Sequence, residues 1–202
     1  HAGWASVAFH VHTAGRKYPA GFNDLCDALD SVRVHADEYG IRKDRIGCMG
    51  FSAGGHLVMN VAEQLAGKPE SPFFVAPLYP VVSMTHPTTH KRSRRGLLGE
   101  FPKEDLKEAL SLEKHVPAEC PPVFLMNCDD DPIVHYHNAE MLDSALTAQH
   151  IPHQYEHYRI GGHGFGVSPE KTTEEAIQWK TRFLNWLYRL LDSDKLMVKN
   201  DD

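Results

Sequence analysis

The chain has 202 residues, of which 42% are hydrophobic and 24% charged, and its formal net charge at pH 7 is −6. These proportions are ordinary for a globular chain, and the length predicts one domain over 1–202. The negative charge argues against nucleic acid as the main partner. No apolar run is long enough to predict a membrane span. No secretory segment is visible. Because the chain begins with His1 rather than Met, we expect that an upstream piece was removed or never included.

Strands and helices are predicted to alternate along the chain. The apolar spacing of residues 22–39 predicts a helix closed by Gly40. The other predicted elements are a strand at 7–11, a short buried strand before Gly50, a helix ending near Leu65, strands at 73–78, 123–127 and 153–159, a helix around 141–146, and a last helix at about 169–191. This alternation predicts an α/β fold with a mostly parallel sheet flanked by helices.

The stretch from about residue 83 to 119 is polar and irregular, with a weak helix predicted at 103–112. We interpret it as a cap-like insertion over one end of the sheet, where substrate contacts are often found. Its basic run, Lys91 to Arg95, is most simply a solvated loop. Contact with an anion or a substrate is the alternative for that run.

The most informative motif is Gly50-Phe51-Ser52-Ala53-Gly54, which lies between an apolar strand and an apolar-periodic helix. Such a sharp turn exposes the serine hydroxyl at the end of the strand. Gly50 and Gly54 are predicted to leave room where side chains would clash with the neighbouring strand and helix. The free N–H groups at the start of the helix favour negative charge, so the N–H of Ala53 is a candidate oxyanion donor.

A serine hydroxyl needs a base to take its proton and a carboxylate to orient that base. Candidate acids follow the predicted strand 123–127, and His163 follows the strand 153–159 within a glycine-rich loop. This order of serine, acid and histidine matches the order found in one large class of hydrolases. We favour Asp131 as the acid, with Asp130 as its alternative, whereas Asp129 is expected to face solvent or cap the turn.

No cofactor and no metal are predicted, because phosphate-binding loops, dinucleotide-binding turns and zinc-ligand spacings are absent from the sequence. The four cysteines form no CxxC pair. The compartment stays open, with the cytoplasm slightly favoured. The oligomeric state also stays open, and a homo-oligomer is one outcome that we consider.

These motifs resemble the α/β-hydrolase superfamily, and within it the small esterases that include acetyl esterases and acetylxylan esterases. The resemblance covers most of the chain. It lies in residues 50–57, 78–84, 97–99, 121–125, 130–134 and 161–166. It implies Ser52 as nucleophile, Asp131 or else Asp130 as acid, and His163 as base.

One departure from the resemblance concerns the oxyanion hole. Members of the family carry an upstream glycine-rich segment that supplies a second oxyanion donor, and nothing in this chain matches it. We therefore expect the chain to lack the first strands of the fold and half of the oxyanion hole.

The sequence thus predicts a serine esterase that acts on acetyl esters of small molecules or oligosaccharides, with acetylated sugars or xylo-oligosaccharides as the expected substrates. One alternative is a serine peptidase of the prolyl-oligopeptidase type, although no propeller-like repeat is visible. Another is a catalytically weak hydrolase fold that acts as a binding subunit, which the missing glycine-rich segment favours.

Overall fold

The computed structural model describes residues 17–198, with side chains described as far as residue 193. The strand predicted at 7–11 lies outside the described residues. Within them, the sheet has four parallel strands in the order β1-β2-β3-β4. Their bounds are β1 Cys48–Phe51, β2 Val75–Leu78, β3 Val123–Cys128 and β4 His153–Tyr158. The predicted fold class is confirmed.

The register brings the carboxyl ends of all four strands to one edge of the sheet. Phe51 pairs with Leu78, and Leu78 pairs with Met126. Cys128 pairs with Tyr158 at the end of β4. Because the strands run in the same direction, the loops that follow β1, β3 and β4 meet at this edge.

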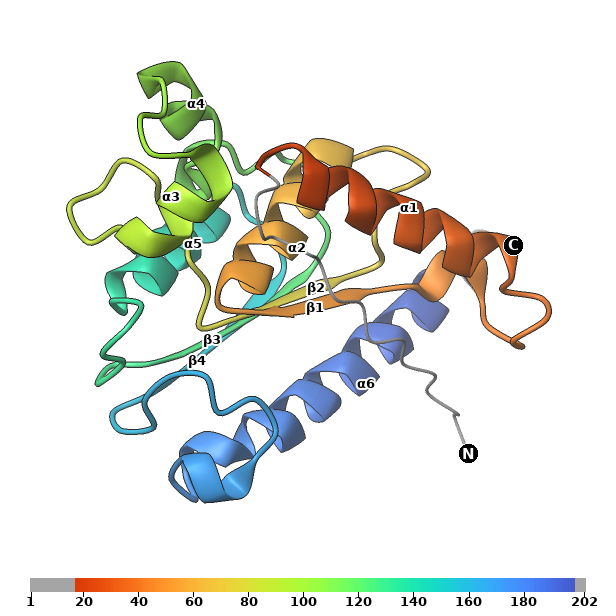
Figure 1. The fold of residues 1–202 in the computed structure, drawn as a ribbon. Helices are drawn as coiled ribbons and strands as arrows, with labels where there is room; N and C mark the ends of the chain where they lie inside the picture. Colours follow the sequence, from red (N-terminus) through yellow and green to blue (C-terminus); the bar gives the residue numbers. More distant parts are fainter. Residues whose placement is uncertain (1–16, 199–202) are drawn as a thin grey trace.

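One face of the sheet is covered by α1 (Ala20–Val34), α2 (Ala53–Leu65) and α5 (His137–Ala148). The apolar side chains of these helices meet those of the strands in one core cluster. The described helix α6 (Trp179–Val198) covers the opposite face (Figure 1). Its aromatic residues pack on Phe74 and Phe124 in a second core cluster. The sheet is therefore buried on both faces, as its continuous apolar strands predict.

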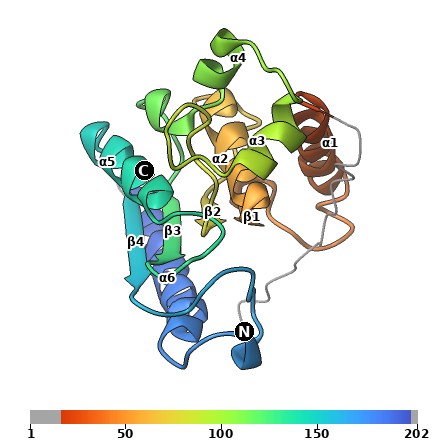
Figure 2. The ribbon, with the colours of Figure 1, turned by 60° about the vertical axis from the view of Figure 1, so that its left-hand side comes forward.

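The segment 83–119 contains α3 (Lys91–Leu98), α4 (Glu104–Ala109) and the short turn η2 (Leu112–Lys114). Figures 1 and 2 place α3 and α4 together on the side of the sheet that α2 covers. The prediction of a loop over Lys91–Arg95 is wrong, since these residues form the first turns of α3. Lysine and arginine are good helix formers, and the last turn buries Leu98 in a third apolar cluster.

Polar side chains attach this segment to the rest of the molecule. Asn138 is fully buried, and its Oδ1 accepts hydrogen bonds from the N–H groups of Val82 and Ser83. His56 in α2 is also buried, and its Nε2 lies 2.9 Å from the carbonyl oxygen of Leu110. Burial lowers the pKa of His56 from 6.5 to about 4, so its neutral ring donates this hydrogen bond at neutral pH.

Helix boundaries differ from the prediction at several places, and α4 ends at Ala109 rather than near residue 112. The first helix ends at Val34, before the predicted end at residue 39, and turns follow it. Gly40 closes these turns with a φ of 63° and the two hydrogen bonds of a Schellman motif, from Gly40 N–H to Asp37 and from Ile41 N–H to Ala36. The last helix begins at Trp179, because 169–178 forms two short turns, η3 (Pro169–Lys171) and η4 (Ala176–Gln178).

Candidate active site

Ser52 lies in the turn between β1 and α2, with a φ of 57° and a ψ of −116°. Non-glycine residues rarely adopt positive φ, and such strain is concentrated at functional sites. Two backbone hydrogen bonds hold the residue in place: its N–H donates to the Leu78 carbonyl at 2.9 Å, and its carbonyl accepts from Val81 N–H at 3.2 Å. The end of β2 therefore fixes the turn that carries the serine.

The glycines of this turn differ in how closely other atoms approach them. A Cβ on Gly50 would collide with the backbone carbonyl of Gly54, as the sequence predicts. The predicted clash at Gly54 is wrong, since no atom of residues 17–198 outside its own turn lies within 4 Å of a Cβ placed there. The crowded helix position is Gly55, where a Cβ would contact Pro80. In α2, Gly55 rather than Gly54 therefore lies against the loop that follows β2.

Asp131 follows β3, and its side chain is fully buried. Its Oδ1 accepts hydrogen bonds from the N–H groups of Ile133 and Val134, at 2.8 and 2.9 Å. Its Oδ2 lies 2.5 Å from Nδ1 of His163. The two backbone bonds occupy one carboxylate oxygen and direct the other toward the imidazole.

His163 lies in the loop after β4, and only 12% of its side chain is exposed. Its Nε2 lies 2.9 Å from Oγ of Ser52. The imidazole therefore connects the Ser52 hydroxyl to the buried Asp131 carboxylate. A neutral imidazole that donates from Nδ1 to Asp131 has its Nε2 free to accept the serine proton.

The two neighbouring aspartates make other contacts. Oδ1 of Asp130 accepts hydrogen bonds from Gly161 and Gly162, at the start of the loop that carries His163. Asp129 faces Nδ1 of His157 at 3.3 Å, on the exposed side of β4. Of the three consecutive aspartates, only Asp131 contacts the imidazole of His163 within the described structure.

Ala53 is the first residue of α2 and is exposed. The first N–H groups of a helix have no acceptor within that helix. The N–H of Ala53 is therefore available to a ligand beside Ser52, at the positive end of the helix dipole. This position suits an oxygen atom that carries negative charge.

Two further residues near the imidazole were not predicted as site residues from the sequence. The ring of Tyr79 lies 4.7 Å from the ring of His163 between centroids. The pKa of His90, directly before α3, is lowered by partial burial and then by the charge of nearby His163. For Tyr79 the sequence offers a weak signal, because an aromatic residue directly follows a predicted buried strand. No sequence signal points to a contact between His90 and His163.

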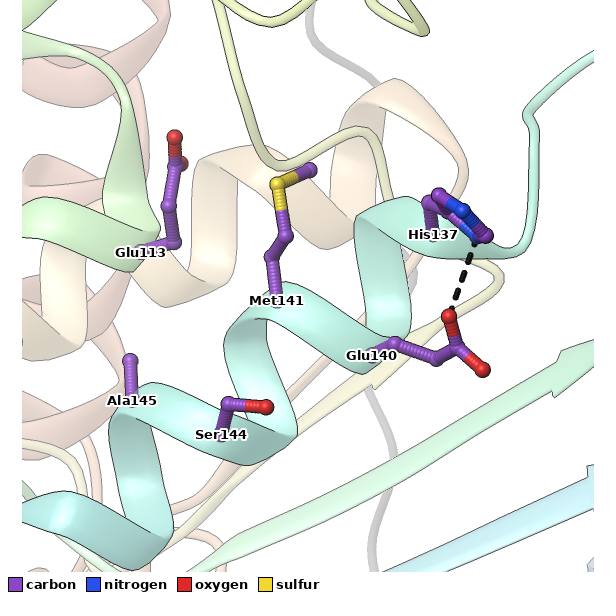
Figure 3. Close-up of a pocket in the computed structure, with 6 residues that line it drawn as sticks. All are labelled: Glu113, His137, Glu140, Met141, Ser144 and Ala145. Atoms are coloured by element: carbon purple, nitrogen blue, oxygen red, sulfur yellow. Dashed lines mark ion pairs between the residues drawn. The ribbon is translucent and has the colours of Figure 1, made fainter.

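Neither of two hollows in the described surface includes these residues. One, of about 420 Å³, lies along α5 and is shown in Figure 3. His137 and Glu140 are among the residues that line it, and they form an ion pair at 3.0 Å. The other, of about 310 Å³, lies beside α2 and includes Glu63 and His115. Neither hollow contains a nucleophile hydrogen-bonded to a base, so the carboxyl edge of the sheet is the better candidate.

Two curated relatives are similar to most of this chain. The chain is 30% identical over 161 residues to endo-1,4-beta-xylanase B of Butyrivibrio fibrisolvens, covering 73% of this chain and 25% of that protein. It is also 30% identical over 164 residues to an acetylxylan esterase of Xylanibacter ruminicola, covering 79% of this chain and 34% of that protein. The chain thus spans about a quarter to a third of the length of these two relatives.

Solved structures show the same fold. An acetyl ester-xyloside bifunctional hydrolase from Caldicellulosiruptor lactoaceticus matches with a TM-score of 0.80 and 29% identity, over 87% of this chain and 68% of that one. The carboxylesterase Cest-2923 from Lactobacillus plantarum matches in fold with a TM-score of 0.74 and 20% identity, over 86% of this chain and 69% of that one.

The model of the prolyl oligopeptidase family matches residues 3–194. The family name matches our alternative prediction, a serine peptidase of the prolyl-oligopeptidase type. The relatives and solved structures above are instead named after hydrolysis of xylan, acetyl esters or carboxylic esters. The match covers nearly the whole chain. The chain therefore belongs to the prolyl oligopeptidase family of α/β hydrolases.

Proposed function

We propose that this chain is a serine esterase that hydrolyses acetyl esters, with acetylated sugars or xylo-oligosaccharides as its substrates. The observation that carries the proposal is the hydrogen-bonded series from Ser52 through His163 to Asp131 at the carboxyl edge of the sheet. A serine paired with an imidazole, which is paired in turn with a carboxylate, is the arrangement needed for acyl transfer.

In the proposed first half-reaction, Ser52 Oγ attacks the acyl carbonyl carbon while His163 Nε2 takes the serine proton. The carbonyl oxygen gains the negative charge, which the N–H of Ala53 stabilises. Asp131 holds the imidazole in the correct tautomer and stabilises its charged form. When the ester C–O bond breaks, His163 returns the proton to the leaving alcohol, and the acyl group stays on Ser52.

In the second half-reaction, water attacks the acyl carbon and gives a proton to His163. The tetrahedral intermediate then collapses, the carboxylic acid leaves, and Ser52 Oγ regains its proton from the imidazole.

The substrate class is proposed from the relatives. The names of two of them combine xylan or xyloside with an acetyl ester. A peptide substrate has less support, because the relatives and structures described above are not named as peptidases.

The test compares wild type with two variants, Ser52→Ala and Ser144→Ala. Ser144→Ala is the matched control, because Ser144 is an exposed serine on α5 that lines the hollow in Figure 3. We expect wild type and Ser144→Ala to hydrolyse nitrophenyl acetate and to release acetate from acetylated xylo-oligosaccharides. Ser52→Ala should lose as much as ~10⁶-fold in kcat. None of the three proteins should cleave a proline-nitroanilide peptide.

Each outcome of these assays tests one part of the proposal. Equal activity in wild type and Ser52→Ala contradicts the serine mechanism. Cleavage of the proline peptide, without ester turnover, supports the peptidase alternative. Turnover of nitrophenyl acetate without release of acetate from the oligosaccharide supports an esterase but contradicts the sugar substrate. A folded chain with no turnover and no reaction with a fluorophosphonate supports the binding-subunit alternative.

A further inference from the structure

Tyr79 has an unusual backbone conformation at a central position. It is the first residue after β2, is only 2% exposed, and has a φ of 36°. Bulky residues rarely adopt positive φ, and those that do are often part of a functional site. Its N–H donates to the carbonyl of Met126 in the adjacent strand β3, which fixes the residue to the centre of the sheet.

The side chain of Tyr79 makes two contacts with the loop that carries His163. Its ring is inclined by 56° to the imidazole, at 4.7 Å between centroids. Its hydroxyl oxygen accepts a hydrogen bond from the N–H of Gly166 at 3.0 Å. Burial raises the pKa of Tyr79 to about 12, so the phenol stays neutral at physiological pH.

The loop that carries His163 needs such contacts, because its glycines allow the backbone to adopt many conformations. Gly162, Gly164 and Gly166 all have positive φ, which glycine adopts without a steric penalty. Asp130 holds the start of the loop, and Nε1 of Trp179 donates to the carbonyl of Gly166 at its end. His163 lies between these two anchors, where the Tyr79 ring contacts it.

The segment that contains Tyr79 also holds the serine. Its neighbours Leu78 and Val81 bind the backbone N–H and carbonyl of Ser52. A single short stretch, from the last residue of β2 to Val81, therefore contacts both partners of the Ser52–His163 hydrogen bond. A shift of the Tyr79 ring would change the position of the imidazole relative to the hydroxyl, and small shifts of this kind reduce catalysis strongly.

We propose that Tyr79 is a positioning residue that holds the imidazole of His163 between Ser52 and Asp131, an inference that rests on the proposed function. The hydroxyl carries this role, because its hydrogen bond with Gly166 fixes the end of the loop on which the imidazole lies. Tyr79 takes no part in proton transfer, because its hydroxyl contacts Gly166 rather than a reacting atom.

The test uses Tyr79→Phe, which keeps the ring and removes the hydroxyl. Tyr155→Phe is the matched control, since it removes a half-buried hydroxyl that donates to Asn127 at 2.7 Å. Two quantities are measured: the rate of Ser52 labelling by a fluorophosphonate, and the far-downfield NMR signal of the proton on His163 Nδ1. The loss of one hydrogen bond predicts labelling about fivefold slower in Tyr79→Phe, and wild-type labelling in Tyr155→Phe.

We also expect the Nδ1 proton signal to broaden in Tyr79→Phe and to stay sharp in Tyr155→Phe. Wild-type labelling together with a sharp signal in Tyr79→Phe overturns the positioning role, as does an equal change in both variants. If wild-type Ser52 does not react at all, the proposed function fails. The NMR comparison still decides the role of Tyr79 in that case, because it requires no turnover.

Discussion

The carboxylate of Asp130 holds the backbone at Gly161, its Oδ1 lying 2.8 Å from the Gly161 nitrogen, and it holds Gly162 in the same way at 2.9 Å. The adjacent carboxylate, on Asp131, instead contacts the imidazole of His163. Two consecutive acids after β3 thus bind the same loop at different points. One holds the loop backbone, and the other holds the side chain proposed as the base.

This division predicts different effects for the same substitution at the two positions. In Asp131→Asn, Oδ1 can still accept from Ile133 and Val134, but the amide group then presents N–H to the imidazole. His163 would take the wrong tautomer, and we expect kcat for nitrophenyl acetate to fall by about 10⁴-fold. Asp130→Asn retains an acceptor for Gly161 and Gly162, so kcat should change by less than about tenfold.

Steady-state kinetics on both variants, with circular dichroism to establish folding, measures this difference. A large loss in Asp130→Asn with little loss in Asp131→Asn would exchange the roles and support the alternative acid. Losses of similar size at both positions would indicate that the loop as a whole, rather than one carboxylate, supports the base.

Chain order explains why the residues predicted as a site lie close together in the structure. Parallel strands gather the residues that follow them at one edge, so a serine after β1, acids after β3 and a histidine after β4 must approach one another. The contact of Asp131 with His163 follows from this arrangement. The choice between Asp130 and Asp131 does not, because both follow the same strand and their orientations depend on the turn.

Other features depend on contacts that are distant in the sequence. The basic run in α3 contains no apolar residue that could show a helical period, and its helix is stabilised by the burial of Leu98 at its end. Tyr79 lies in an apolar run that predicts only a buried strand, while its hydroxyl contacts a residue 87 positions away. Neither feature could be predicted from local periodicity.

The two glycines of the serine turn should respond differently to alanine. In Gly50→Ala, the new Cβ meets the Gly54 carbonyl, and a backbone group cannot move aside as a flexible side chain can. We expect a loss of about 3 kcal/mol or more in the free energy of unfolding. Gly54→Ala places a Cβ in open space on a helix, so its stability should stay equal or rise by up to about 1 kcal/mol.

Urea unfolding of both variants tests this prediction. Equal destabilisation at the two positions would show that the turn tolerates neither side chain and that the crowding at Gly50 has no special role. Stabilisation by Gly50→Ala would contradict the close approach of the Gly54 carbonyl.

Glu63 in α2 should make stability fall as the pH rises. Burial, and then the charge of Glu113, raise the pKa of Glu63 from 4.5 to about 9. Between these values the folded chain holds a proton that the unfolded chain releases. Its contribution is therefore complete below pH 4.5 and is lost as the pH approaches 9, at up to about 1.4 kcal/mol per pH unit.

The measurement is the free energy of unfolding of Glu63→Gln from pH 5 to pH 8. Glutamine cannot ionise, so this variant should gain stability over wild type as the pH rises. Glu119→Gln, at an exposed position, is the control and should follow wild type. A constant difference between Glu63→Gln and wild type across this range would contradict the raised pKa.

His56 should have the opposite effect in the acid range. Its pKa in the folded chain is about 4, against an ordinary value of 6.5, because burial disfavours the charged ring. Between these values the unfolded chain binds a proton that the folded chain does not. The contribution of neutral His56 is therefore complete above pH 6.5 and is lost as the pH falls toward 4, at up to about 1.4 kcal/mol per pH unit.

Removing this histidine should flatten the acid side of the stability curve. His56→Gln keeps an N–H donor for the Leu110 carbonyl, so its stability at pH 7 should remain within about 2 kcal/mol of wild type. At pH 5 the variant should be the more stable relative to wild type. His115→Gln is the control, because His115 contacts the Glu108 carbonyl at 2.8 Å from an exposed position. Equal slopes in His56→Gln and wild type would contradict the lowered pKa of His56 in the folded chain.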